Sequence, residues 1–154
     1  MTESRIHIAS RVILSSPRAI FRAFLDAESV ASWRPPKGMT AQIVSFDPRV
    51  GGGYRMAFHY PPTEHGRGKS TDDADIFEGR FLEILPDTKI VEAVVFEADD
   101  PSFSGTMTIT TSLTPVAEGT KVSFSAENVP SGISEADHRA GMESTLKNLA
   151  NFLE

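Results

Sequence analysis

The fold of this chain is decided by the stretch SEADHRAGMESTLKNLANFL, residues 134–153, which predicts one long amphipathic helix. Ser134 is a typical N-cap, and Asp137 three residues later completes a capping-box pattern. Apolar side chains then recur at spacings of three and four residues: Met142, Leu146, Leu149 and Leu153. Three further side chains are expected on the same face: His138, Thr145 and Phe152. Such a helix is about 30 Å long and therefore spans a small domain.

Composition is typical of an ordinary globular chain. Its 154 residues suit one domain, residues 1–154, and 40% of them are apolar. A net charge of −6 without a basic cluster argues against a nucleic-acid partner. The absence of cysteine excludes disulfides, a thiol nucleophile and thiolate metal sites. No apolar run is long enough for a membrane helix and no signal-like segment is present, so we expect a cytoplasmic protein without membrane insertion.

The N-terminal part of the chain predicts one strand followed by two short helices. Residues 5–14 (RIHIASRVIL) show the period-two pattern of a strand, with apolar side chains at Ile6, Ile8, Val12 and Leu14. Ser16-Pro17 predicts a helix start, because serine caps the helix and proline suits its first position. A second short helix is expected over residues 28–33, since Pro35-Pro36 ends it.

The middle of the chain predicts six further strands, at residues 41–47, 54–60, 76–85, 90–97, 104–113 and 120–127. Residues 61–73 contain almost no apolar side chain and predict a loop. The other connections are short, which favours antiparallel neighbours because a parallel crossover needs a dozen residues or more. We therefore predict an α+β fold in which a seven-stranded, curved antiparallel sheet wraps around the C-terminal helix, with two short helices between the first and second strands.

Several motifs resemble the START-like helix-grip superfamily, also called SRPBCC. They are FRAFLDAESVASWRPPKG (21–38), VSFDPRVGGGYRM (44–56), GRFLEILPD (79–87) and GMESTLKNLANFLE (141–154). Within this superfamily the chain is most similar to the AHSA branch, the proteins that resemble the activator of the heat-shock-protein-90 ATPase. Many members of that branch carry tryptophan where Met142 stands. The resemblance implies the fold but no single activity, because the superfamily includes carriers, cyclases, hydrolases and chaperone regulators.

If the sheet wraps around the helix, the space between them forms a cavity. We expect twelve residues to line it and to bind a ligand: Trp33, Tyr54, Met56, Phe58, Tyr60, Met107, Ile109, Phe124, His138, Met142, Thr145 and Leu149. The alternative interpretation is plain core packing. His138 either holds a ligand's polar end or bonds a loop carbonyl or water. Trp33 either gates the entrance or anchors the end of the second short helix.

The remaining polar groups give weaker signals. Three charged residues interrupt apolar strands and are expected on the outer face or in cross-strand pairs: Glu78, Arg80 and Glu92. Five possible metal ligands follow no known spacing, so we expect no metal: His59, His65, Asp72, Asp73 and Asp75. Arg49 and the triple glycine at 51–53 are expected to form a turn, because no helix start follows them.

The favoured function is therefore a carrier or sensor that binds a small apolar molecule, without a cofactor and without an assigned catalytic residue. One alternative is an enzyme of the cyclase, hydrolase or dehydratase type that uses His138, Tyr54 or Tyr60 as acid–base groups. Another is a module that binds a protein partner. Homodimerisation is compatible with each of these functions. Activation of heat-shock-protein-90 belongs to multidomain relatives and is not carried over to this chain.

Overall fold

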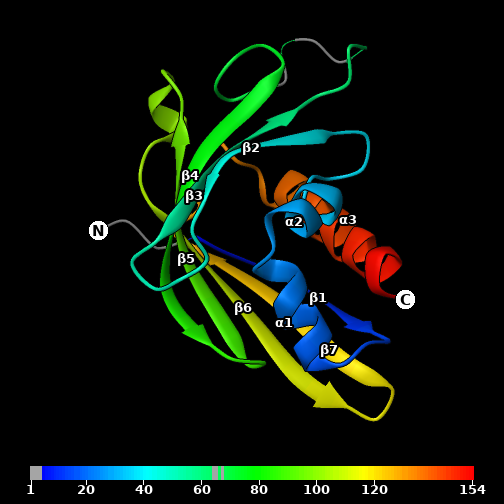
Figure 1. Cartoon of the computed structure of the whole chain (residues 1–154). Helices are drawn as coiled ribbons and strands as arrows, with labels where there is room; N and C mark the ends of the chain where they lie inside the picture. The colour runs from blue at the N-terminus through cyan, green and yellow to red at the C-terminus, as the bar shows by residue number, and fades with distance from the viewer. Residues whose placement is uncertain (1–4, 64–65, 67) are drawn as a thin grey trace.

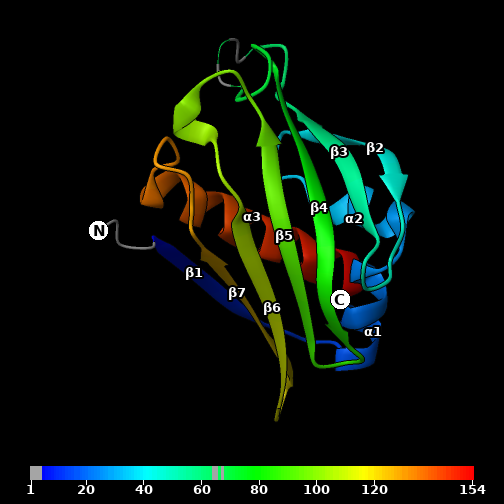
Figure 2. The ribbon, with the colours of Figure 1, turned by 90° about the vertical axis from the view of Figure 1, so that its left-hand side faces the viewer.

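In the part of the chain that the computed structural model describes, residues 5–63, 66 and 68–154, a seven-stranded antiparallel sheet curves around one long helix (Figure 1). The strand order is β1-β7-β6-β5-β4-β3-β2, so the first and last strands in the sequence are neighbours in the sheet. Figure 2 views the sheet from its outer side, with the long helix crossing behind it. The predicted α+β helix-grip fold is confirmed.

The elements follow the predicted order closely. The first part of the chain forms β1 (Ile6–Ile13), α1 (Pro17–Phe24), α2 (Ala27–Trp33), β2 (Thr40–Phe46) and β3 (Gly53–His59). The second part forms β4 (Ala74–Leu85), β5 (Lys89–Glu97), the 3₁₀ helix η1 (Pro101–Phe103), β6 (Met107–Val116), β7 (Gly119–Glu127) and α3 (Glu135–Leu153). Among the described residues, no helix is long and apolar enough to cross a membrane.

Side-chain caps define where α1, α2 and α3 begin. The hydroxyl of Ser16 accepts a hydrogen bond from the Ala19 amide, and Pro17 occupies the first helical position. Ser134 caps α3 in the same way, with 3.1 Å from its Oγ to the Asp137 nitrogen. The Asp26 carboxylate caps α2, which therefore begins at Ala27.

The 3₁₀ helix η1 is absent from the predicted elements. The Asp100 side chain accepts a hydrogen bond from the Ser102 amide, and Pro101 fixes the backbone for a tight turn. The turn lies between the strands that the sequence predicts at residues 90–97 and 104–113. As a result β6 begins at Met107, three residues later than expected.

The buried face of β1 is the opposite of the one that its apolar pattern suggests. Four apolar side chains at or beside β1 are 44–59% exposed: Ile6, Ile8, Val12 and Leu14. His7, Ala9 and Ile13, on the other face, are buried. The pairing with β7 selects this face, because Ala9 lies opposite Phe124 and His7 opposite Ala126, and both β7 residues belong to the core. The inner face of β1 also packs against α3.

Helix α3 buries a stripe formed by Met142, Thr145, Leu146, Leu149 and Ala150. This confirms the amphipathic pattern with one exception. Phe152 was expected on the buried face but is 45% exposed, because it lies at the margin of the stripe in the last turn of the helix. Ala150 and the partly buried Leu153 contact the core there instead.

These burial differences predict how two substitutions in α3 affect stability. Leu146→Ala removes a side chain that is 1% exposed, and should lower the free energy of unfolding by about 2–5 kcal/mol. Phe152→Ala should cost about 1 kcal/mol at most, because its ring remains largely in water. Urea unfolding followed by circular dichroism measures both values. Equal losses for the two variants would contradict the buried face described here.

Candidate functional site

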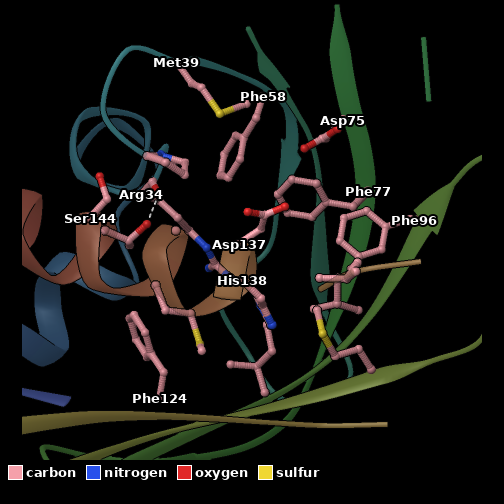
Figure 3. Close-up of a pocket in the computed structure, with 18 of the residues that line it drawn as sticks. Arg34, Met39, Phe58, Asp75, Phe77, Phe96, Phe124, Asp137, His138 and Ser144 are labelled. Atoms are coloured by element: carbon pink, nitrogen blue, oxygen red, sulfur yellow. Dashed lines mark hydrogen bonds between the residues drawn. The ribbon is translucent and has the colours of Figure 1, made fainter. Parts of the chain in front are cut away.

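A cavity of about 650 Å³ lies between the sheet and α3 (Figure 3). Its walls come from the inner faces of β3 to β7, from α3, and from the segment that follows α2. Seven of the apolar lining residues are aromatic: Phe24, Trp33, Phe58, Phe77, Phe96, Phe103 and Phe124. The volume lies within the range of about 300–1,000 Å³ that is usual for small-molecule sites.

The structure brings most of the predicted ligand-binding residues to this cavity. Those that line it are Trp33, Phe58, Tyr60, Met107, Ile109, Phe124, His138, Met142 and Thr145. Tyr54, Met56 and Leu149 lie outside its lining. Met56 and Leu149 are fully buried in the core, and Tyr54 is held in a polar cluster. Ligand binding by the residues that line the cavity stays a prediction.

Trp33 both anchors α2 and contributes to the cavity wall. Its indole Nε1 donates a hydrogen bond to the carbonyl of Ala23, at 3.0 Å, and its ring packs against Phe24 with 4.6 Å between ring centres. The side chain is 1% exposed. A ring held by these contacts is a fixed part of the wall rather than a gate.

A buried ion pair between Arg34 and Glu92 forms part of the same wall. The guanidinium Nη2 lies 3.0 Å from Glu92 Oε1, and the Tyr54 hydroxyl donates to the same oxygen at 2.7 Å. Arg34 also donates to the Tyr54 hydroxyl at 3.1 Å. Glu92 was expected on the outer face but is 1% exposed on the inner face. Glu78 and Arg80 are exposed as expected, and Glu78 pairs with Arg55 across the strands.

Mutual compensation keeps this cluster charged inside the protein. Burial lowers the pKa of Arg34, but the nearby Glu92 carboxylate and Tyr54 hydroxyl together raise it above its usual value. Burial also raises the pKa of Tyr54, so its phenol keeps the proton that it donates to Glu92. A buried charge without such partners would be strongly destabilising. The sequence contains one signal for the burial of Glu92. Its position alternates with Ile90 and Val94, so all three side chains share the buried face of β5.

A second polar cluster lies where the 61–73 loop meets the sheet. Asp75 is buried at the start of β4 and accepts hydrogen bonds from the Tyr60 hydroxyl and the Lys69 backbone amide, at 2.9 and 2.8 Å. The Lys69 ammonium lies 3.1 Å from the same carboxylate and above the Phe96 ring. Asp75 is thus a paired structural carboxylate rather than part of a solvated loop. His65, another of the possible metal ligands, lies outside the described residues, and among the described residues no three candidate ligands gather.

His138 hydrogen-bonds to a second histidine rather than to a loop carbonyl. Its Nδ1 lies 2.8 Å from Nδ1 of His7 in β1, so one ring donates and the other accepts. Burial is the largest cause that lowers the pKa of His138, and together with the nearby His7, Lys69 and Arg5 it brings this pKa to about 4. The pKa of His7 is lowered by burial and by Arg5 and Arg139, against an opposing effect of Glu135. The pair therefore links β1 to α3 in the uncharged state.

Comparisons with known proteins agree on the family. The family model described as "Activator of Hsp90 ATPase homolog 1-like protein" matches residues 15–154. Protein CV1439 from Chromobacterium violaceum is 30% identical, with a TM-score of 0.83 over 97% of this chain and 98% of that one. Mll3558 from Rhizobium loti is 28% identical, with a TM-score of 0.72 over 98% of both chains. No curated protein matches the chain significantly.

A more distant structure shows the same fold. The AHSA1-like protein from Aeromonas hydrophila is 16% identical, with a TM-score of 0.71 over 96% of this chain and 91% of that one. At this identity the likeness concerns the fold alone.

The histidine pair predicts that stability falls as the pH is lowered from about 6.5 toward 4. The pKa of His138 is about 4 in the folded protein against 6.5 in the unfolded chain. Unfolded molecules therefore bind the proton first, and stability that is present above pH 6.5 is lost as the pH falls toward 4. His138→Gln should flatten this dependence in urea unfolding curves recorded across the range. An identical pH dependence in both proteins would show that the pair does not carry the effect.

Proposed function

This chain belongs to the family of activator of Hsp90 ATPase homolog 1-like proteins, and we propose that it binds a small, largely apolar molecule in the cavity between the sheet and α3. The observation that carries the proposal is the cavity itself, about 650 Å³ of space with seven phenylalanine and tryptophan side chains in its wall. A concave site of this size with apolar walls and a few polar groups is the usual form of a small-molecule site.

The arrangement of the polar groups supports binding rather than catalysis. The three residues considered as acid–base groups have different partners: Tyr54 bonds Glu92, Tyr60 bonds Asp75, and His138 bonds His7. Among the described residues, no hydrogen bond joins any two of the three. General acid–base catalysis needs such groups to converge on one reacting centre. We therefore assign these side chains to holding the cavity walls in place.

The walls are held in a defined shape before any ligand arrives. The Thr145 hydroxyl donates to the Arg34 carbonyl at 2.9 Å, and the Asn148 amide donates to the Pro35 carbonyl at 2.9 Å. These bonds fix the segment after α2 against α3, beside the cavity. A preformed site avoids the entropy cost of ordering its walls on binding. This favours a carrier or sensor over a surface that folds only around a partner.

The proposal predicts that an apolar aromatic probe stabilises the protein. Naphthalene at about ten times its dissociation constant should raise the melting temperature by about 3–6 °C, because binding to the folded state alone adds RT ln(1 + [L]/Kd) to stability. Met142→Trp places a larger side chain in the cavity wall and should weaken naphthalene binding at least about tenfold in calorimetric titrations. Circular dichroism verifies that this variant folds.

Phe152→Trp is the matched control, since it introduces the same side chain on an exposed part of the same helix. It should bind naphthalene like the unaltered protein. Equal affinity in all three proteins would move the site away from this cavity. Native mass spectrometry of protein purified from its own host would then identify a retained molecule directly, as a mass above that of the denatured chain.

A further inference from the structure

We propose that the Arg34–Glu92 pair is a hydroxyl-binding subsite of the cavity, and that the preferred ligand is an uncharged aromatic molecule that carries a hydroxyl group. This inference rests on the proposed function and adds the chemical class of the ligand. Arg34 and Glu92 both line the cavity, and each keeps hydrogen-bonding groups that no described residue uses.

The Glu92 carboxylate has one oxygen in use and one available. Tyr54 and Arg34 both contact Oε1, at 2.7 and 3.0 Å. No described residue donates to the second oxygen, Oε2. Glu92 belongs to the cavity lining, and 1% of its side chain is exposed. An unpaired carboxylate oxygen in a cavity wall is an acceptor for a ligand's donor.

The guanidinium of Arg34 likewise keeps donors free. Its Nη2 serves both Tyr54 and Glu92, whereas Nε and Nη1 make no hydrogen bond to a described residue. The Arg34 side chain retains 13% exposure, and Figure 3 shows it among the lining side chains. The pair thus presents an acceptor on Glu92 and donors on Arg34.

Tyr54 demonstrates which group fits such a pair. Its hydroxyl donates to Glu92 at 2.7 Å and accepts from Arg34 at 3.1 Å, so an uncharged phenol satisfies both side chains at once. The two charges also cancel, which leaves no net attraction for an ionic ligand. A carboxylate or an ammonium group near the pair would be attracted by one member and repelled by the other, so the pair would not compensate its loss of hydration. A ligand hydroxyl can repeat, on the cavity side, the contacts that Tyr54 makes.

The surroundings favour a ring attached to that hydroxyl. Val94 and Phe96 follow Glu92 on the same face of β5, and the Phe96 ring lies 5.9 Å from that of Phe77. Phe58 meets Phe77 edge-to-face at 4.9 Å. Aromatic walls of this kind stabilise an aromatic guest through edge-to-face and stacked contacts. Thr111 also belongs to the cavity lining, but its hydroxyl oxygen is itself buried and is not accessible to a ligand.

Calorimetric titration with three matched probes tests the inference: 1-naphthol, naphthalene and 1-naphthoate. We expect 1-naphthol to bind at least about tenfold more tightly than naphthalene, as a hydrogen bond to a charged group allows. We expect 1-naphthoate to bind more weakly than 1-naphthol. In E92Q, the preference for 1-naphthol over naphthalene should fall to about threefold or less.

Two further variants keep the test decisive. R34M/E92L removes both charges together, so it leaves no unpaired buried charge, and it should also lose the preference for 1-naphthol. E78Q makes the same chemical change as E92Q on an exposed outer-face residue and should keep the preference. Circular dichroism verifies the fold of each variant.

The possible outcomes distinguish the proposal of a hydroxyl subsite from the proposal that the cavity binds an apolar molecule. Equal binding of 1-naphthol and naphthalene to the unaltered protein, or a preference that persists in both E92Q and R34M/E92L, overturns the hydroxyl subsite and leaves the apolar cavity standing. Failure of all three probes to bind the unaltered protein overturns the proposed function, and the subsite with it.

Discussion

The antiparallel pairing of β1 with β7 is the contact on which the rest of the fold depends. It joins the first strand to the last one, from Ile6 opposite Glu127 to Ile13 opposite Thr120. The chain must then cross the inner side of the sheet, through α1 and α2, to reach β2 at the far edge. Helix α3 leaves β7 and packs on the same inner side. One pairing therefore places α1, α2 and α3 on the concave face, and no helix of the described residues covers the outer face of the sheet (Figure 2).

The inner surface of the sheet carries both the core and the cavity wall, and small residues decide where the large ones lie. Gly79 lies opposite Tyr54 in the β3–β4 pairing, and a Cβ atom at residue 79 would come within 2.1 Å of the tyrosine ring. The missing side chain lets the Tyr54 ring lie across β4. Its hydroxyl can then reach Glu92 on β5. Gly79 on β4 thus helps to position a hydrogen bond between Tyr54 on β3 and Glu92 on β5.

Paired polar groups connect the cavity to three different parts of the fold. Arg34 and Glu92 join the segment after α2 to β5, Lys69 and Asp75 join the loop to β4, and His7 and His138 join β1 to α3. Because each pair has its partner within the protein, the groups hold the walls in position instead of converging on one reacting centre. In the Arg34–Glu92 pair, Arg34 Nε and Nη1 and Glu92 Oε2 make no hydrogen bond to a described residue.

The sequence by itself determined the order of the elements, the capped start of α3 at Ser134 and the family, because periodicity, caps and turns are local signals. Tertiary structure decided which faces those elements bury. The face of β1 with Ile6 and Ile8 points outward because pairing with β7 sets the register, and Phe152 is exposed because it lies at the margin of the α3 stripe. Glu92 could be placed on the inner face by its period-two relation to Ile90 and Val94. Its partner Arg34 is 58 positions earlier in the chain, and only the three-dimensional fold brings the two charges together.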